Sequence, residues 1–456
     1  MVTFRIIENT NNIKNIISDI NMGSICTMIP IFSDSNLHSL NDKNELSMLY
    51  INVDNNQSYI FPFNHCDSTN IDSSLINNFF SIEIPILTFN KKSLHGITNI
   101  SKLFDVNLMN YYINNTPLDI SDIRVNAIDV FNNRYYNLKN VNSFIPLTKH
   151  IEWCDMLSDK LYSTVDTFKS FNDKDMVNSY NRYNTDVIES LHSIEQNGLY
   201  VSDNIVDQFD DRVKKHINNN IVYSNYNIYT STGRPSNSFG NINFAALKKN
   251  TGERTSFISR FDNGILVEYD YDAYHLRLIG SLIGYNFSNE SVHEHFSKIY
   301  DVSYEESKQI TFKILYGGID KEISDNIEFF KKTEMFIDEL WSEFKSEKEI
   351  KTYIYNRPMC NRNFIDIDRS KLFNFYIQSM ETEYNIKKIV KIQELLQNYN
   401  SKLVLYGYDS FLFDIDTRDG KQLLQDIRLE LESDGFITKI ESGKNYNDII
   451  DVSDKI

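Results

Sequence analysis

The segments VEYDYDAYHLR, residues 267–277, and LYGYDSFLF, residues 405–413, decide the fold that we predict for this chain. Each brings an aspartate, Asp270 or Asp409, to the end of a run of strand-forming residues. The second segment has such residues on both sides of an Asp-Ser pair, which predicts a β-hairpin with that pair as its turn. Two carboxylates at neighbouring strand ends can hold a pair of Mg²⁺ ions roughly 3.5–4 Å apart, as in-line phosphoryl transfer requires. Taken alone, each aspartate is more often an ordinary surface residue.

A third segment lies between these two and repeats a side-chain pattern every four residues. In KQITFKILYGG, residues 308–318, the side chains of Lys308, Phe312 and Tyr316 would share one face of a helix that ends at the two glycines. A cation, an aromatic ring and a phenol in a row suit the phosphates, sugar and base of a nucleoside triphosphate. Without its context, the same pattern also fits an ordinary amphipathic helix with aromatic residues in the core.

The three segments resemble, in order and in content, motifs A, B and C of family A DNA polymerases. Other parts of residues 190–416 also resemble the pattern of that family: IEQNGLYVSD at 194–203, TGRPS at 232–236, NIN at 241–243, RTSF at 254–257, HEHF at 293–296, and an Asn-x3-Gln pair at Asn374 and Gln378. The chain is therefore similar to a compact polymerase of this family, of the phage or viral kind.

The resemblance implies an α+β polymerase right-hand fold, with an antiparallel palm sheet, helical fingers and a reduced helical thumb, after an α/β exonuclease-like (RNase H-like) domain. The implied parts are a degenerate 3′–5′ exonuclease-like domain at 1–160, the thumb at 161–244, the palm at 245–285 and 351–456, and the fingers at 286–350. Only residues 204–231 are left for a thumb tip, so we expect low processivity or a processivity partner.

The first domain lacks the carboxylate pattern that an exonuclease of this family needs. No Asp-x-Glu occurs before residue 170, and Asp34 and Asp155 are the nearest equivalents of the family's metal ligands. Because a two-metal nuclease needs several carboxylates at one place, we expect a structural remnant that does not cleave DNA.

The family's functional roles can be carried over by resemblance to individual residues. Asp270 and Asp409 would be catalytic and would bind two Mg²⁺ ions, for which Mn²⁺ can substitute, and the carbonyl of Tyr271 would be a further ligand. Lys308 would also be catalytic, assisting the departure of pyrophosphate. The dNTP would contact His275, His293, Lys308, Phe312 and Tyr316. The primer–template DNA would contact Arg234, Asn241, Asn243, Arg254, Asn374, Gln378 and Tyr408.

Four positions depart from the family's pattern. Tyr304 stands where the family has an arginine that grips the triphosphate, and this exchange is not conservative at a phosphate site. His275 replaces the glutamate that excludes the ribose 2′-OH, and its bulk predicts that a steric gate is retained. Ser410 and Tyr408 replace the glutamate and the histidine of motif C.

Composition agrees with a globular protein. The 456 residues include 13% aromatic residues, so low-complexity disorder is not expected. A net charge of −17 disfavours a nucleic-acid coat protein, whereas a polymerase needs only a local positive track. That track would come from Lys248, Lys249, Arg254, Arg260, Lys308, Lys313, Arg357 and Arg362. The dispersed cysteines, and the lack of an apolar leader or an 18-residue apolar run, predict a cytoplasmic protein (host cytoplasm if phage-encoded) without a membrane partner.

Three interpretations remain open. The first is a DNA-directed DNA polymerase of phage or viral replication. The second is a catalytically silent homologue that serves as a DNA-binding or scaffold subunit; Tyr304, the degraded nuclease and the short thumb favour it, whereas the joint presence of Asp270, Asp409, Lys308 and Tyr316 disfavours it. The third is a single-subunit RNA polymerase or a primase, which TGRPS, the Asn-x3-Gln pair and the gate residue disfavour. Primer extension with dNTPs against NTPs separates the three.

Overall fold

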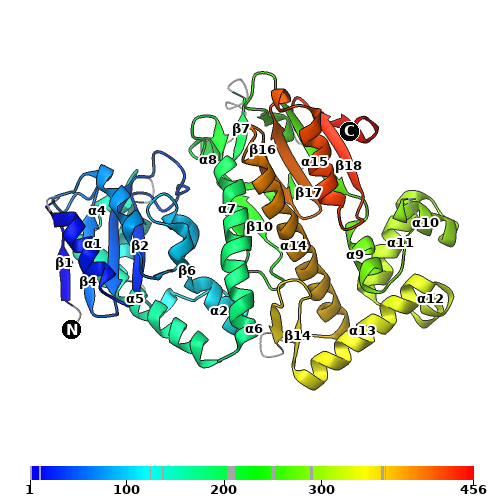
Figure 1. The fold of residues 1–456 in the computed structure, drawn as a ribbon, viewed down its shortest axis with the longest axis horizontal. Coiled ribbons are helices and arrows are strands. Elements are labelled where there is room, and N and C mark those ends of the chain that lie inside the picture. Colours follow the sequence, from blue (N-terminus) through cyan, green and yellow to red (C-terminus); the bar gives the residue numbers. More distant parts are fainter. Residues whose placement is uncertain are drawn as a thin grey trace. The chain divides into compact units, whose positions relative to one another are not determined.

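The computed structural model describes residues 3–9, 12–123, 125–135, 138–202, 211–247, 253–287, 291–360, 364 and 366–456. The chain divides into two compact units, Met1–Glu189 and Ser190–Ile456 (Figure 1). A boundary at residue 160 would cut helix α5 (Leu147–Ser170), so the first unit extends beyond the exonuclease-like domain that we predicted. The division of the remaining chain into thumb, palm and fingers stays a prediction.

The first unit is built on a six-stranded mixed sheet with the order β1-β4-β3-β2-β5-β6. The pairs β2–β3 and β3–β4 are antiparallel, whereas β1–β4, β2–β5 and β5–β6 are parallel. The strands are β1 (Thr3–Ile6), β2 (Cys26–Phe32), β3 (Leu46–Val53), β4 (Gln57–Pro62), β5 (Ile86–Thr88) and β6 (Leu103–Asp105). The helices are α1 (Ile13–Asn21), α2 (Val106–Asn114), α3 (Asn126–Arg134), α4 (Val141–Phe144), α5, α6 (Lys174–Arg182) and, crossing into the second unit, α7 (Ile188–Asn197).

Central strand β3 is buried along its whole length because helices cover both faces of the sheet. Leu49 and Ile51 face the apolar cluster that includes the buried isoleucines of α1. On the other face, the hydroxyl of Tyr50 donates to the carboxylate of Asp155 on α5, and the Tyr162 hydroxyl donates to the carbonyl of Asn52 at 3.0 Å. This alternation is the period of two expected for a strand, and it produces the α/β architecture that the sequence predicted for this part of the chain.

The two aspartates nearest to exonuclease ligands are engaged with different partners. Asp155 accepts from Tyr50 and lies 3.4 Å from the hydroxyl of Ser58, whereas Asp34 accepts from the backbone N–H of Asn36 at 2.8 Å. Within the described ranges, no group of three or more His, Cys, Asp or Glu side chains is placed to hold a metal ion. The exonuclease ancestry of this unit remains a prediction.

The second unit contains a five-stranded sheet with the order β16-β17-β13-β18-β19, in which every pair is antiparallel. Its strands are β13 (Ile265–Tyr271), β16 (Lys402–Gly407), β17 (Ser410–Ile415), β18 (Thr438–Gly443) and β19 (Ile450–Asp451). The hydroxyls of Tyr269 and Tyr271 donate to the carbonyls of Leu424 and Leu431 in α15 (Lys421–Glu432), each at 2.8 Å, so α15 covers their face of the sheet. Because side chains alternate along a strand, Asp270 projects from the opposite face.

Helices dominate the stretch that we predicted to be the fingers. They are α10 (Val292–Tyr300), α11 (Tyr304–Gly317), α12 (Lys321–Asn326) and α13 (Glu328–Glu347). Fully buried Phe296, Phe329 and Phe330 pack with ring centroids 5.3–5.7 Å apart, which gives this group of helices an aromatic core.

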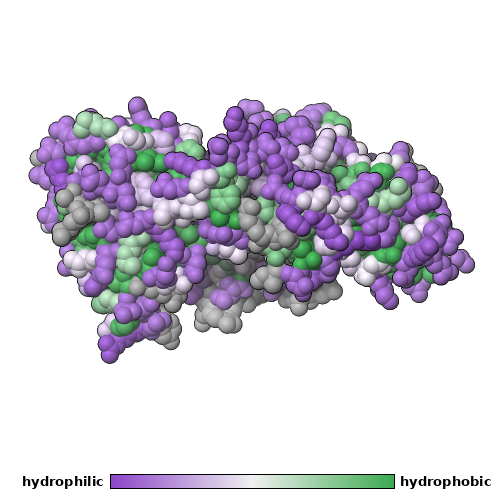
Figure 2. Space-filling view, turned by 90° about the horizontal axis from the view of Figure 1, so that it is seen from below, coloured by the Kyte–Doolittle hydropathy of each residue, from purple (hydrophilic) through white to green (hydrophobic). Residues whose placement is uncertain are grey.

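The remaining elements of the second unit are three helices and a set of short strands. The long helix is α14 (Arg369–Leu396), and the others are α8 (Asp211–Lys214) and α9 (Tyr274–Leu282). The short strands are β7 (Leu199–Val201), β8 (Ile221–Val222), β9 (Tyr226–Asn227), β10 (Ser236–Phe239), β11 (Ile242–Asn243), β12 (Phe257–Ile258), β14 (Glu349–Lys351) and β15 (Pro358–Cys360). The face shown in Figure 2 is mainly hydrophilic with scattered apolar residues. None of the described helices has the length and apolar character needed to cross a membrane.

The structure of the first unit leads to a prediction about nuclease activity. We expect the purified protein to leave single-stranded and mismatched primer ends intact in the presence of Mg²⁺, because Asp34 and Asp155 do not form a shared carboxylate cluster. Gel analysis of a 5′-labelled primer over time measures this. Metal-dependent shortening of the primer that disappears in Asp34→Ala or Asp155→Ala would contradict the expectation.

Candidate active site

The register between β13 and β17 brings Asp270 and Asp409 to the same end of the sheet. Asp270 pairs with Ser410, and the backbone N–H of Tyr271 donates to the Asp409 carbonyl at 2.9 Å. Neighbouring strands lie about 4.8 Å apart, so the two aspartates occupy adjacent places. The predicted hairpin is present, but its turn is shifted by one residue: Gly407 pairs with Ser410, so the turn is Tyr408-Asp409.

The turn residue Tyr408 has a backbone φ of 67°, a conformation that residues other than glycine seldom adopt. The Asn385 side-chain amide on α14 donates to the Tyr408 carbonyl, and its oxygen accepts from the Tyr274 hydroxyl at 2.9 Å. Strained backbone of this kind persists where surrounding contacts hold it in place. Asp409 is therefore presented at a turn that α14 and α9 fix.

The junction between β13 and α9 is similarly constrained. Ala273 takes the left-handed conformation, φ 48°, directly before the first residue of α9. The Arg277 guanidinium donates to the Asp272 carboxylate at 2.8 Å and to the Asp272 carbonyl at 3.0 Å. This tight turn places His275 in the first turn of α9, close in sequence and in space to the end of β13.

The electrostatic surroundings of Asp409 are unfavourable for its charge. Although its carboxylate is exposed to solvent, partial desolvation by the surrounding protein, followed by the negative charge of Glu381, raises the pKa of Asp409, while Arg234 and His275 act in the opposite direction. A divalent cation would stabilise the charged form of this carboxylate. Two neighbouring carboxylates are suitable donors for Mg²⁺, which commonly binds one or two carboxylates and takes its other ligands from water and substrate phosphates.

Helix α11 carries the predicted Lys308, Phe312 and Tyr316 face. The helix begins with a capping box between Ser303 and Glu306 and ends at Gly318, whose φ is 113°. The rings of Phe312 and Tyr316 are stacked, with centroids 6.1 Å apart and planes 6° apart, and the Lys308 side chain is exposed. The prediction of a helix that ends at the two glycines is confirmed.

His293 and Tyr304 lie next to each other beside the α11 face, but His293 is buried and Tyr304 is exposed. His293 is 3% exposed, and its ring packs against Tyr304 and Phe312 with centroids 5.5 and 5.9 Å away. Its burial, followed by the charge of Lys308, lowers its pKa. The nucleotide contact that we predicted for His293 stays a prediction, and the buried ring packs against Phe312 of α11. Tyr304 is 41% exposed at the start of that face and brings no charge.

Sequence reasoning missed Glu381, the residue that connects most of the site. This carboxylate on α14 is 1% exposed. It lies 2.9 Å from Arg234 Nε and accepts from Arg234 Nη2 at 3.2 Å, and it lies 3.1 Å from His275 Nε2. His275 Nδ1 is hydrogen-bonded to the Tyr316 hydroxyl, and the Arg234 guanidinium lies 3.7 Å over the Tyr408 ring. The only sequence signal was an acidic residue three positions after Gln378, on the same helix face.

The predicted DNA contacts are placed unevenly. Gln378 donates to Asn374 at 2.9 Å on a partly accessible face of α14, and Asn241 and Asn243 are exposed at the β10–β11 turn. Arg254 is partly committed within the protein, since its Nε donates to the Leu247 carbonyl at 2.9 Å and its guanidinium lies 4.3 Å over the Tyr446 ring.

The predicted positive track is only partly present. Arg260 donates to Asp414 at 2.8 Å, and buried Arg357 donates to the Thr232 carbonyl at 2.8 Å, so both stabilise the fold. Lys308 and Lys313 are exposed on α11. Lys248, Lys249 and Arg362 lie outside the described residues.

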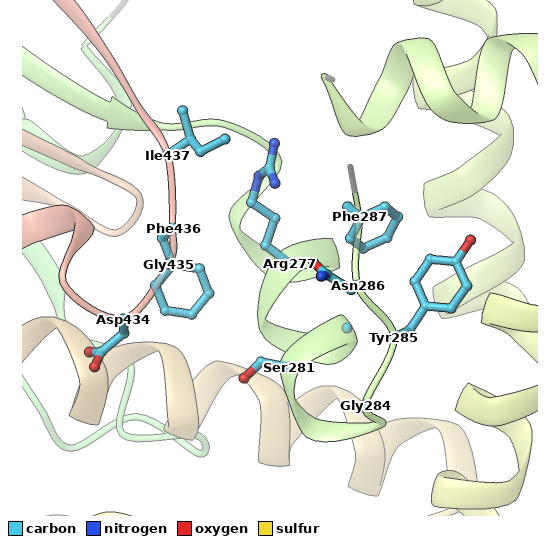
Figure 3. A pocket seen from close by; sticks show the side chains of 11 residues that line it. Arg277, Ser281, Gly284, Tyr285, Asn286, Phe287, Asp434, Gly435, Phe436 and Ile437 are labelled. Atoms are coloured by element: carbon cyan, nitrogen blue, oxygen red, sulfur yellow. The ribbon is translucent and has the colours of Figure 1, made fainter. Parts of the chain in front are cut away.

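A pocket on another side of α9 is a weaker candidate (Figure 3). The pocket is lined by residues of α9, of the loop that follows α9, and of the loop between α15 and β18; they include Gly280, Tyr285 and Phe436. Its charged groups are already paired, because Arg277 binds Asp272, and Asp434 lies 2.7 Å from Lys388. We therefore assign the functional site to the end of the sheet where Asp270 and Asp409 lie.

Comparison with solved structures identifies the fold. The chain is similar to the POL domain of Pol1 from M. smegmatis, which was solved in complex with DNA primer-template and dNTP. The TM-score is 0.71, the sequence identity is 11%, and the match covers 98% of this chain and 100% of that domain. No protein-family model matches the sequence, and no curated protein matches it. The chain thus has the fold of a polymerase POL domain, which the three sequence motifs predicted.

The electrostatics of Asp409 lead to a prediction about stability. Because its folded-state pKa is raised, its contribution to stability is present below the ordinary pKa of aspartate and is lost as the pH rises through the raised value. Asp409→Asn should therefore have a higher melting temperature than the wild type in EDTA at neutral pH. The difference between the two melting temperatures should shrink as the pH is lowered towards about 4. Mg²⁺ should raise the melting temperature of the wild type more than that of the variant.

Asp416→Asn is a matched control with the opposite sign. A hydrogen bond from the Arg418 side chain is the main cause that lowers the pKa of Asp416, so this residue contributes stability above the ordinary aspartate pKa that is lost as the pH falls. Thermal denaturation of both variants between about pH 4 and neutral pH tests the assignment. A lower melting temperature for Asp409→Asn at neutral pH, as expected for Asp416→Asn, would show that Asp409 stabilises the fold instead.

Proposed function

We propose that this protein is a DNA-directed DNA polymerase that adds dNTPs to a primer 3′-OH on a template by two-metal phosphoryl transfer, with release of pyrophosphate, in phage or viral replication. The observation that carries the proposal is the adjacency of Asp270 and Asp409 at one end of the sheet, joined through His275 to the α11 face of Phe312 and Tyr316. The similarity in fold to a domain solved with DNA primer-template and dNTP supports it. Family membership, the viral setting and a cytoplasmic location are parts of this proposal.

The metal would be held by the side chains of Asp270 and Asp409, with the Tyr271 carbonyl as a further ligand. Bound Mg²⁺ supplies Lewis-acid activation of the primer 3′-OH and neutralises charge on the departing pyrophosphate. The register of β13 and β17 gives Asp270 and Asp409 adjacent backbone positions before any metal binds, because both are at ends of paired strands. Such preorganisation is what electrostatic catalysis requires.

The nucleotide would lie along the exposed face of α11. Lys308 provides a cation without a competing ion pair among the described residues, so it is available to the phosphates. The parallel rings of Phe312 and Tyr316 provide flat surfaces for the sugar and base. His275, fixed between Tyr316 and Glu381, would limit the space beneath the deoxyribose.

The primer–template would contact the side of the site that is formed by Arg234, Tyr408 and α14. Arg234 and Tyr408 are stacked next to Asp409, which suits the end of the primer strand. The amides of Asn374 and Gln378 can hydrogen-bond to minor-groove acceptors that all correct base pairs share. Contacts of this kind test the shape of a base pair rather than its sequence.

Two alternatives are tested by the same assay. A catalytically silent DNA-binding homologue is favoured by Tyr304, since an uncharged side chain stands at the start of the α11 face. A single-subunit RNA polymerase or primase would prefer NTPs. Primer extension by the pure protein with dNTPs supports the proposal, no extension with either nucleotide supports the silent homologue, and a preference for NTPs supports the RNA polymerase.

Substitution of either catalytic aspartate should abolish extension without loss of the fold. We expect Asp270→Asn and Asp409→Asn each to reduce the rate at least a hundredfold, in the range of about 10²–10³ that loss of a transition-state contact produces. Single-turnover extension and gel-shift binding of primer–template measure the two quantities. Asp426→Asn is the control and should behave as wild type, because Asp426 is on α15, which packs on the face of the sheet opposite Asp270. An aspartate variant that retains near wild-type rate would refute the role of that residue.

Lys308 should carry most of the positive charge that meets the triphosphate. Because no arginine precedes it on α11, Lys308→Ala is expected to cost roughly 2–4 kcal/mol of transition-state stabilisation, mainly in kcat. Lys313→Ala is the control, since this exposed lysine lies on the same helix but off the Lys308 face. A small loss for Lys308→Ala together with a large loss for Lys313→Ala or Arg254→Ala would move the phosphate contact to one of those cations.

A further inference from the structure

Glu381 is a buried carboxylate with direct partners from two separate segments of the second unit and an indirect link to a third. Arg234 comes from the loop before β10, His275 from α9, and Tyr316 on α11 is reached through His275. A buried carboxylate is costly unless it is paired and hydrogen-bonded. The Arg234 guanidinium balances the charge of Glu381, and His275 Nε2 is hydrogen-bonded to Glu381 Oε2.

The carboxylate decides which nitrogen of His275 carries the proton. A carboxylate accepts, so His275 Nε2, 3.1 Å from Glu381, is the donor, and when the imidazole is neutral its Nδ1 is an acceptor. The Tyr316 hydroxyl can fill that role as donor, because burial, followed by the charge of Glu381, raises its pKa and keeps its proton in place. The hydrogen bonds therefore run in one direction, from Tyr316 to His275 to Glu381.

This chain of hydrogen bonds fixes the His275 ring at the place where the incoming sugar would lie. A ring held at both nitrogens cannot rotate away from an added hydroxyl group, whereas an unanchored ring could. The same carboxylate also holds Arg234 over Tyr408, the residue that precedes Asp409. Glu381 thus orients side chains on both sides of the site through Arg234 and His275.

We propose that Glu381 is a specificity-determining positioning residue, which anchors His275 from α14 and so sets the preference for deoxyribose over ribose. This inference rests on the proposed polymerase function. The carboxylate that is missing at the gate position, His275 on α9, is then supplied by Glu381 on α14. Sugar selection then depends on two residues from different helices rather than on the gate side chain alone.

The test compares Glu381→Gln and Glu381→Ala with a matched control. Glu383→Gln removes another buried carboxylate of α14, which accepts from the Thr352 hydroxyl at 2.6 Å and the Tyr355 N–H at 3.0 Å. Residues two positions apart on a helix do not share a face, so Glu383 points away from the side on which Glu381 lies. We expect Glu381→Ala to raise the ratio of NTP to dNTP incorporation about tenfold, as a steric contact of that size would, and Glu381→Gln to raise it less, because the amide keeps the volume. Glu383→Gln should lower the melting temperature and leave the ratio unchanged.

A double-variant cycle shows whether Glu381 acts through His275. His275→Ala alone should raise the ratio about tenfold, and His275→Ala with Glu381→Ala should raise it no further, because the anchored ring is already absent. A change in ratio for Glu383→Gln equal to that for Glu381→Gln, multiplied effects in the double variant, or an unchanged ratio for both Glu381 variants would each overturn the proposal. Melting temperatures identify a variant that does not fold, and Glu381→Gln then decides.

A binding measurement separates failure of this inference from failure of the proposed function. The wild type should bind dATP more tightly than ATP on a dideoxy-terminated primer–template with Mg²⁺, and Glu381→Gln should narrow that difference, whereas Glu383→Gln should not. If the wild type extends primers but the difference does not narrow, only the role of Glu381 is refuted. If the wild type neither extends primers nor binds dATP, the proposed function itself is refuted.

Discussion

The site depends on one constraint, the register of β13 between β17 and β18. Side chains alternate along a strand, so a slip of one residue would turn Tyr269 and Tyr271 away from α15 and Asp270 towards it. The two tyrosine hydroxyls bind α15 carbonyls in the present register, and Phe411 packs edge-on against Tyr271 with ring centroids 5.8 Å apart. These buried contacts make the slip costly, and they thereby keep the side chain of Asp270 on the face of the sheet opposite α15.

A second constraint is that negative charge is concentrated at the end of this sheet. The charge of Glu381 disfavours the charged form of Asp409, and the Arg234 guanidinium, which is paired with Glu381, opposes this effect. The strained backbone at Tyr408 and Ala273 adds a further cost at the same place. Unfavourable charge and strain are retained together beside two adjacent aspartates, which is where a divalent cation would relieve the repulsion.

The sequence allowed the local elements and their order to be predicted, because those follow from short-range patterns. The α11 helix with its terminal glycines, the hairpin around Asp409 and the polymerase fold were all inferred before the structure. The turn was misplaced by one residue because strand-forming residues flank both possible turns. The roles of Glu381 and His293 depend on tertiary contacts between segments far apart in the chain, and the periodicity of one helix reveals which face a residue lies on but not what meets that face.

The arrangement of the cations explains how an acidic chain could act on DNA and what limits it. With a net charge of −17, the chain as a whole repels phosphate, so attraction must be local. Among the described cations of the predicted track, Arg260 and Arg357 bind the chain's own carboxylate and carbonyl groups, whereas Lys308 and Lys313 of α11 are exposed. A protein that neutralises few phosphates gains little from counterion release and so holds DNA weakly. For the function that we propose, stable attachment to primer–template would then depend on a partner that supplies further contacts with the DNA, whereas the proposed chemistry would need only the end of the sheet that carries Asp270 and Asp409 and the face of α11.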